Sequence, residues 1–234
     1  MNKEEFIIAL RELGINLTDE MLEKLDVYYK LLIEYNLHTN LTRITEEKEV
    51  YLKHFYDSLT LIKAVNLEKQ TLLDVGTGAG FPGMVLKIVF PDLKITLVDS
   101  LNKRIVFLNS VIEKLNLKNI EAIHARAEEY AVNNKEKFDI VTSRAVANLN
   151  ILSELCIPMV KLHGYFIPMK AEVESELNES KRAIKTLGGV LKETVIFSLP
   201  KDAGLRTLLQ IEKISKTSDK YPRKFNEIKK KPLK

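Results

Sequence analysis

The segment LLDVGTGAGFPG, residues 72–83, places four glycines within eight positions, directly after an apolar run. Gly78, Gly80 and Gly83 match the G-x-G-x-x-G pattern of loops that let a ligand approach the backbone closely. Phe81 lies in the same loop and is a candidate side wall for that ligand. Two kinds of ligand fit the pattern: a dinucleotide, whose pyrophosphate such loops cradle, or a ligand without phosphate.

Acidic residues follow the first three predicted strands and favour the ligand without phosphate. Asp74 lies at the end of the first strand, where it would repel a pyrophosphate and attract a cation. Asp99, in LVDS, stands where nucleotide-binding folds hold the ribose hydroxyls. Ala127 and Glu128 come after the third strand and are candidates to border an adenine. S-adenosylmethionine, an adenosine with a cationic methionine end, fits these residues together with Gly78, and NAD remains the rival.

Arg144, in TSRAV, follows the fourth predicted strand, where the substrate crevice of such a sheet opens. Its guanidinium suits a carboxylate, a phosphate or a base edge. We therefore expect it to contact the cofactor, the substrate or both, and an ion pair at the start of the next helix is the alternative.

The sequence restricts the kind of methyl acceptor. Cys156 lies in a predicted helix and is poorly placed as the nucleophile that carbon methylation of cytosine needs. The segment SRAVAN, residues 143–148, replaces the Asn/Asp-Pro-Pro-aromatic motif expected for exocyclic amine methylation. A ring nitrogen such as guanine N7 needs neither device, because its lone pair can attack the sulfonium methyl in line.

The elements that position these residues alternate between short β-branched runs and helical segments, which predicts an α/β fold with a mostly parallel, doubly wound sheet. The last two strands have only PKDAGLR between them, so we expect an antiparallel hairpin, unlike a symmetric dinucleotide-binding fold. The predicted strands are 71–75, 94–99, 120–125, 138–143, 165–170, 194–199 and 207–214.

Before residue 67 the pattern is helical. Thr18 can cap a helix that carries Asp19 and Glu20 in its first turn, and a second amphipathic segment follows Thr45 and runs toward Ala64. We expect an N-terminal helical extension (1–66), a methyltransferase domain (67–214) and a basic C-terminal tail (215–234).

Composition limits the class of protein. With 234 residues and 45% hydrophobic content, the chain can bury a core. It has no apolar run of the roughly 20 residues that span a bilayer, and its start reads as a charged helix, so we expect a cytoplasmic protein without membrane contact. The single cysteine excludes an internal disulfide and a cysteine-based zinc site, and we expect no metal.

The net charge of +4 is unevenly distributed, because residues 213–234 hold nine Lys or Arg against two acidic residues, a local charge of +7. Such a segment suits a polyanion, and a solvated terminus is the alternative. The candidates for RNA contact there are Arg223, Lys224, Lys229, Lys230 and Lys231.

The chain resembles, nearly end to end, the bacterial ribosomal RNA small-subunit methyltransferase G family, also called glucose-inhibited division protein B. The ending departs from the family pattern Y-P-R-R-x-G-x-P-x-K-x-P-L at Lys224, Phe225 and Asn226, which leaves the detailed RNA contacts of the tail open. The segments that carry the resemblance are YNLHTNLTRIT (35–45), HFYDSL (54–59), LLDVGTGAGFPG (72–83), LVDSLNKRIVFL (97–108), ARAEE (125–129), FDIVTSRAVANL (138–149), GYFIPMKA (164–171) and YPRKFNEIKKKPL (221–233).

The resemblance implies S-adenosylmethionine-dependent N7 methylation of one guanosine in 16S ribosomal RNA, within the small subunit or an assembly intermediate, by a protein that we expect to be a monomer. Carried over residue by residue, it places Gly76, Phe81, Ala127, Glu128 and Arg144 at the cofactor.

The resemblance also suggests that YNLHTNLTRI lies near the catalytic mouth, although Asn36, Asn40 and Thr42 could simply end a helix. His54 and Asp57 stand three residues apart on a predicted helix. They either form a mutual or capping hydrogen bond or contact the substrate. The catalytic residues stay unknown, with Arg144, Asn36 and His54 as positioning candidates.

Overall fold

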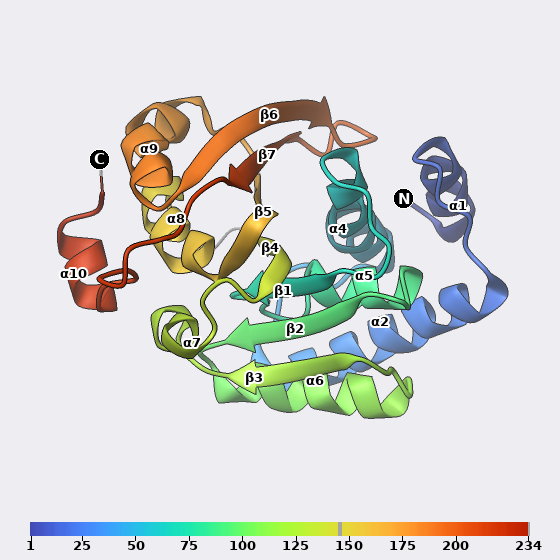
Figure 1. Ribbon diagram of the computed structural model, residues 1–234. Coiled ribbons are helices and arrows are strands. Elements are labelled where there is room, and N and C mark those ends of the chain that lie inside the picture. Colours follow the sequence, from blue (N-terminus) through green and yellow to red (C-terminus); the bar gives the residue numbers. More distant parts are fainter. Residues whose placement is uncertain (145–146, 234) are drawn as a thin grey trace.

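A seven-stranded sheet lies at the centre of the molecule, in the order β3-β2-β1-β4-β5-β7-β6 (Figure 1). The computed structural model describes residues 1–144 and 147–233. Strands β1 to β5 are parallel, and β7 is antiparallel to both β5 and β6. This confirms the predicted fold class and the terminal hairpin. The strands are β1 (Thr71–Val75), β2 (Lys94–Asp99), β3 (Ile120–His124), β4 (Phe138–Arg144), β5 (Val160–Lys170), β6 (Gly189–Ser198) and β7 (Leu205–Lys213).

Helices cover both faces of the sheet. The α-helices are α1 (Lys3–Glu12), α2 (Asp19–Thr39), α3 (Glu47–Val50), α4 (Asp57–Leu59), α5 (Gly83–Val89), α6 (Asn102–Lys114), α7 (Ala127–Asn133), α8 (Leu149–Cys156), α9 (Glu174–Thr186) and α10 (Phe225–Lys230). The shorter turns are η1, a π-helical turn (Tyr51–Tyr56), and the 3₁₀ turns η2 (Thr60–Lys63) and η3 (Ile157–Met159).

Two apolar cores lie on opposite faces of the sheet, because successive strand residues point to opposite sides. Leu72 of β1 belongs to the core under α2, α5 and α6, whereas Leu73 belongs to the core under α7, α8 and α9. Both leucines are fully buried. The central strands β1, β2 and β4 are therefore buried along most of their length, as expected for strands covered on both faces.

The N-terminal helices share their core with the sheet. Thr18 caps α2 by accepting a hydrogen bond from the Met21 N–H, as predicted. Phe6, Leu25 and Tyr28 are fully buried in the same cluster that holds the sheet residues facing α5. Residues 1–66 thus have no separate core among the described residues, and the division of the chain at residues 66 and 214 stays a prediction.

The end of the chain packs onto the core that lies under α7, α8 and α9, instead of extending into solvent. Lys213, the first residue of the basic stretch 213–234, is buried and donates to the Ile157 carbonyl at 3.0 Å and to Thr217 Oγ1 at 2.7 Å. Tyr221 and Ile228 are buried in the cluster with α8. Within residues 1–144 and 147–233, no helix is long and apolar enough to cross a membrane.

Candidate active site

The glycine loop connects β1 to α5 and turns through left-handed backbone at three positions. The φ angles are +69° at Gly76, +62° at Gly78 and +103° at Gly80, a region that side chains rarely adopt. At Gly80 a Cβ would lie 2.7 Å from the Tyr28 hydroxyl, which donates to the Ala79 carbonyl. Tyr28 of α2 therefore holds the loop in place, and Gly80 has no room for a side chain at this contact.

Asp74 lies under the loop and holds its shape. Its Oδ2 accepts hydrogen bonds from Thr77 Oγ1 at 2.7 Å and from the Gly83 N–H at 2.9 Å. The side chain is fully buried, and burial raises the pKa of this carboxyl to about 6. Among the described residues, its Oδ1 has no hydrogen-bond partner. Any attraction of Asp74 for a cationic ligand therefore acts through space and not through an exposed carboxylate.

Asp99 lies at the end of β2 and connects the loop to α6. Its Oδ2 accepts from the Gly78 N–H at 2.9 Å and from Arg104 Nη1 at 3.0 Å, and its Oδ1 accepts from the Leu101 N–H at 2.9 Å. The residue is 2% exposed. Arg104 thus shares the carboxylate that the sequence predicts for a ribose.

Two of the backbone donors that would receive a pyrophosphate are already used. In a dinucleotide site, loop amides and the first amide of the following helix point at phosphate oxygens. Here the Gly78 N–H is bonded to Asp99, and the Gly83 N–H, the first of α5, is bonded to Asp74. These bonds disfavour the NAD alternative.

Two cavities meet at the carboxyl end of the sheet. The larger, of about 380 Å³, lies between the loop and the N-terminal segment, and the smaller, of about 220 Å³, lies between β2, α7 and α8. Gly76, Asp99 and Ser100 line both, so Asp99 stands at their junction. The smaller cavity is lined by Val75, Gly76, Val98, Asp99, Ser100, Ala125, Arg126, Ala127, Glu128, Leu155 and Phe225.

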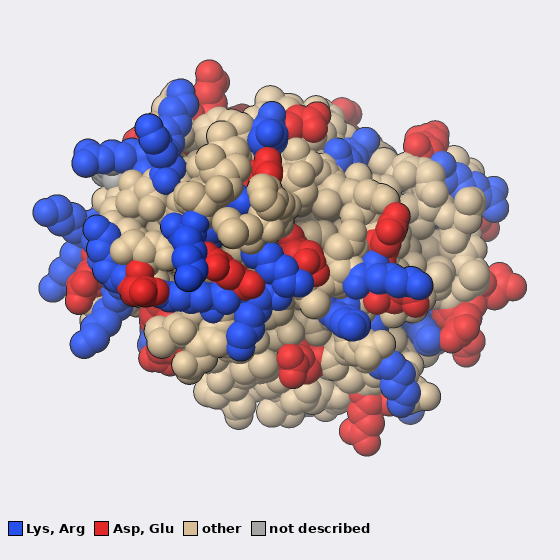
Figure 2. Space-filling model, in the orientation of Figure 1, with Lys and Arg blue, Asp and Glu red and all other residues tan. Residues whose placement is uncertain are grey.

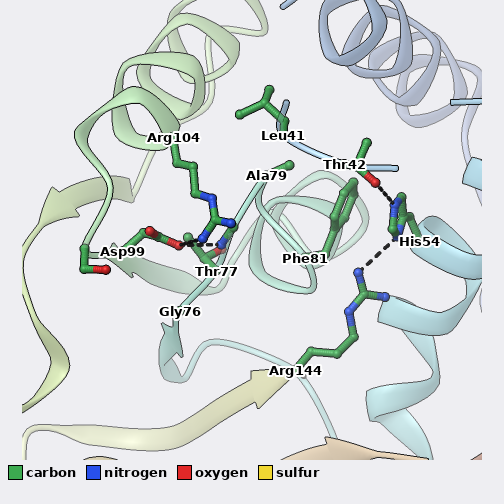
Figure 3. Close-up of a pocket in the computed structure, with 12 residues that line it drawn as sticks. Leu41, Thr42, His54, Gly76, Thr77, Ala79, Phe81, Asp99, Arg104 and Arg144 are labelled. Carbon is green, nitrogen blue, oxygen red and sulfur yellow. Dashed lines mark hydrogen bonds and ion pairs between the residues drawn. The ribbon is translucent and has the colours of Figure 1, made fainter. Parts of the chain in front are cut away.

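The larger cavity brings together residues from five separate segments of the chain (Figure 3). In the close-up, Arg104 and Asp99 lie on one side of the glycine loop, and His54 and Arg144 lie on the other, beside Phe81. The lining residues are Leu41, Thr42, His54, Gly76, Thr77, Gly78, Ala79, Phe81, Asp99, Ser100, Arg104 and Arg144.

Arg144 is held in place by residues of the N-terminal extension. Its Nη1 donates to Asp57 Oδ2 at 2.9 Å and to the Lys53 carbonyl at 3.1 Å, and its Nη2 lies 3.2 Å from His54 Nδ1. Arg206 Nε donates to the other oxygen of Asp57 at 2.8 Å. The side chain of Asp57 is 3% exposed. Arg144 therefore makes a buried ion pair, but with Asp57 and not with the helix that follows it.

His54 is a neutral ring with both nitrogens engaged. Because Arg144 can only donate, Nδ1 of His54 is the acceptor and Nε2 carries the proton, which it donates to Thr42 Oγ1 at 2.9 Å. Burial, followed by the charge of Arg144, lowers the pKa of His54 to about 3. The ring stacks on Phe81 with centroids 4.3 Å apart, and Asn36 Oδ1 accepts from the Thr42 N–H at 2.9 Å.

The chain is similar to known proteins over nearly its whole length. A family model described as rRNA small subunit methyltransferase G matches residues 21–203. The chain belongs to this family. Proteins named ribosomal RNA small subunit methyltransferase G are 55% identical in Lachnoclostridium phytofermentans, over 97% of this chain and 96% of the relative, and 50% identical in Bacillus subtilis, over 100% and 99%.

Solved structures of lower identity share the fold. A SAM-dependent methyltransferase from Aquifex aeolicus has a TM-score of 0.55 and 17% identity over 74% of this chain and 97% of its own. M. jannaschii TYW2 in complex with AdoMet has a TM-score of 0.57 and 16% identity over 74% and 80%. The predicted enzyme class of the rRNA small subunit methyltransferase G family, an S-adenosylmethionine-dependent rRNA methyltransferase, is confirmed.

The cavities of this family member suit its cofactor. The smaller cavity combines apolar walls with the carboxylates of Asp99 and Glu128, which suits a base and the hydroxyls of a ribose. Gly76, Gly78 and Phe81 line the larger cavity, which suits the methionine part. The individual contacts remain predictions, but the structure brings Gly76, Gly78, Phe81, Asp99, Ala127, Glu128 and Arg144 to these two cavities and places Asp74 beneath them.

The predicted RNA-contact residues fall into two groups. Arg223 is committed to Glu154 of α8, which is fully buried, through its N–H at 3.0 Å, Nε at 2.8 Å and Nη2 at 2.6 Å. Its arrangement indicates a structural role. The lysines are exposed and free to face a polyanion, and they are Lys224, Lys229, Lys230 and Lys231.

Sequence reasoning missed several residues that the fold brings to the site. Arg104 of α6 pairs with Asp99, the last residue of β2, and their spacing of five residues across a strand-to-helix turn is not one of the i,i+3 or i,i+4 spacings that signal a pair on a helix. Arg206 reaches Asp57 across 149 residues of sequence, and no local pattern announces that contact. The same holds for Phe225 of the predicted tail, which lines the smaller cavity.

Proposed function

We propose that this protein transfers a methyl group from S-adenosylmethionine to N7 of one guanosine in 16S ribosomal RNA. The observation that carries the choice of N7 is the lack of a free base at the larger cavity, within the part of the chain that the structure describes. His54 uses both ring nitrogens, and Asp99 accepts three hydrogen bonds. An exocyclic amine or a hydroxyl would need help to lose its proton, whereas N7 has none to lose.

The cofactor, when bound, supplies a methyl group on a sulfonium, which the N7 lone pair can take by direct in-line attack. The protein then has only to orient the two reactants and exclude water. Phe81 and His54 form a stacked pair at the mouth, and the Arg144 guanidinium lies over the Phe81 ring, 5.2 Å from its centroid. Asp57 and Arg206 fix that guanidinium, so these side chains provide a rigid wall for positioning.

We propose further that the acceptor is 16S ribosomal RNA within the small subunit or an assembly intermediate. The names of the relatives, which refer to the small ribosomal subunit, support this choice. The exposed lysines of the C-terminal segment supply a surface for phosphates. We also propose that the protein acts as a monomer and in the cytoplasm, where ribosomes are assembled.

Mass spectrometry of 16S RNA digests tests the proposal. Cells with and without the gene are compared, and the deletion strain is complemented with the parent protein and with Arg144→Gln. We expect the deletion to lose one N7-methylguanosine, the parent to restore it and Arg144→Gln to restore less of it at equal protein level. An unchanged spectrum in the deletion strain would refute the proposal and would support an RNA-binding protein without catalytic activity.

A further inference from the structure

Phe225 of α10 lines the smaller cavity, although it lies in the predicted RNA-binding tail and beyond the residues that match the family model. It stands there with Leu155 of α8 and with Ala127 and Glu128 of α7. The ring is partly buried and packs against the core that contains Leu155. The wall of the cofactor cavity therefore includes a residue of the C-terminal segment, residues 221–231.

The C-terminal segment is anchored beside this cavity. Arg223 makes three hydrogen bonds to the fully buried carboxylate of Glu154, the residue that precedes Leu155. Tyr221 and Ile228 are buried in the same core, on either side of Phe225. These contacts hold the Phe225 ring against the cavity, and loss of the anchor would remove it.

The outer side of the same segment is basic. Its exposed charges are four lysines and one acidic residue, Glu227. Figure 2 shows Lys and Arg side chains projecting from the left edge of the molecule, where Figure 1 places α10. Four positive charges on one short segment form a surface for RNA phosphates. The exposed lysines are Lys224, Lys229, Lys230 and Lys231.

We propose that Phe225 closes the adenosine side of the cofactor site and that the C-terminal segment thereby couples RNA binding to cofactor binding. This rests on the proposed function. RNA that binds the lysines stabilises the docked segment, and the docked segment completes the cavity. Because linkage is reciprocal, bound cofactor strengthens RNA binding by the same factor.

Calorimetric titration with S-adenosylhomocysteine tests the first half. We expect Phe225→Ala to raise the dissociation constant about tenfold, as for loss of one aromatic contact, and Phe225→Leu to raise it less. The control, Ile8→Ala, removes an exposed apolar side chain from α1, which lines neither cavity, and should leave the dissociation constant for S-adenosylhomocysteine unchanged. Thermal unfolding identifies folded variants, and Phe225→Leu serves where Phe225→Ala does not fold. An unchanged constant in a folded Phe225 variant would overturn the proposal.

The second half is tested with a 16S RNA transcript. RNA should lower the dissociation constant of the wild-type protein for S-adenosylhomocysteine at least about fivefold, within the usual range of coupling. Lys229→Gln with Lys230→Gln should reduce this effect and leave the constant without RNA unchanged. The matched control is Lys114→Gln with Lys118→Gln, two exposed lysines at and after the end of α6. Equal constants with and without RNA in the wild-type protein would overturn the coupling.

These outcomes are separate from a failure of the proposed function. If the wild-type protein binds S-adenosylhomocysteine and one N7-methylguanosine disappears in the deletion strain, the proposed function stands whatever the Phe225 variants do. If that modification persists in the deletion strain, the proposed function fails, while the titrations still report on Phe225.

Discussion

His54 should make the folded protein sensitive to mild acid. The ring is 8% exposed, and burial lowers its pKa in the folded protein to about 3, from the ordinary histidine value of 6.5. Between these values the unfolded chain binds a proton that the folded chain does not, so stability falls as pH falls below 6.5. For these two pKa values, lowering the pH from 7 to 5 costs about 2 kcal/mol.

The physical reason is that the protonated ring has no place in the folded site. A proton on Nδ1 would face the Arg144 guanidinium, which donates to that nitrogen now. To titrate, His54 would have to break that contact and leave its stack on Phe81. The acid form therefore loses a hydrogen bond and meets a like charge in a buried position.

Urea unfolding at pH 7 and pH 5, for the wild-type protein and for His54→Gln, measures this term. Glutamine cannot titrate, so the difference between the two proteins removes the contribution of all other groups. We expect the wild-type protein to lose about 2 kcal/mol more than the variant between the two pH values. A difference under about 0.5 kcal/mol, or an NMR titration in which the His54 ring protonates near pH 6.5, would refute the assignment of a neutral ring.

Four further outcomes follow from buried contacts. Asp57→Ala should destabilise the protein by about 3 to 5 kcal/mol in urea unfolding, because it leaves Arg144 and Arg206 without their shared partner. Arg223→Ala should lower the free energy of unfolding by about 3 kcal/mol in the same measurement, because Glu154 stays buried and unpaired. A loss below about 1 kcal/mol would contradict the role of Arg223 as the anchor of the C-terminal segment. Gly80→Ala should lower the free energy of unfolding by about 2 kcal/mol more than Gly78→Ala, and lower cofactor affinity more, because a Cβ at Gly80 meets neighbouring atoms and one at Gly78 does not; equal effects would contradict this. Burial lowers the pKa of Lys213 to about 8, so the unfolded chain binds more protons than the folded chain up to about pH 10. The free energy of unfolding of the wild-type protein, relative to that of Lys213→Met, should therefore rise by about 2.5 kcal/mol between pH 7 and pH 10. A difference that does not change with pH would show that Lys213 is not desolvated.

The strands of the sheet could be predicted from the sequence because each strand carries its own local pattern of apolar residues. Apolar runs between turn residues predicted all seven strands, although β5 and β6 each begin five residues earlier than expected. The additional residues at the start of β5, VKLHG, mix polar and apolar side chains at an irregular stretch of the β4 pairing. Partners on a neighbouring strand, and not local propensity, extend the strand there.

The site could be predicted less completely from the sequence, because its contacts join distant parts of the chain. Arg144 reaches Asp57 over 87 residues, and Arg223 reaches Glu154 over 69. The charge pattern of the tail predicted a polyanion surface but could not separate Arg223, which anchors the segment, from its exposed neighbours. That separation depends on which side of a short folded segment each residue occupies.

The glycine loop shows how buried carboxylates restrict a general pattern. Glycine spacing alone allows a pyrophosphate, because every such loop offers free amide donors near a helix start. In this chain Asp99 takes the Gly78 amide and Asp74 takes the first amide of α5. What remains is a loop in which these two donors are satisfied internally and the nearest fixed charges are negative, an environment that favours a cation over a phosphate. The acids that the sequence suggested as ligand contacts thus act first on the backbone, and they select the ligand by the donors they remove as well as by the charge they add.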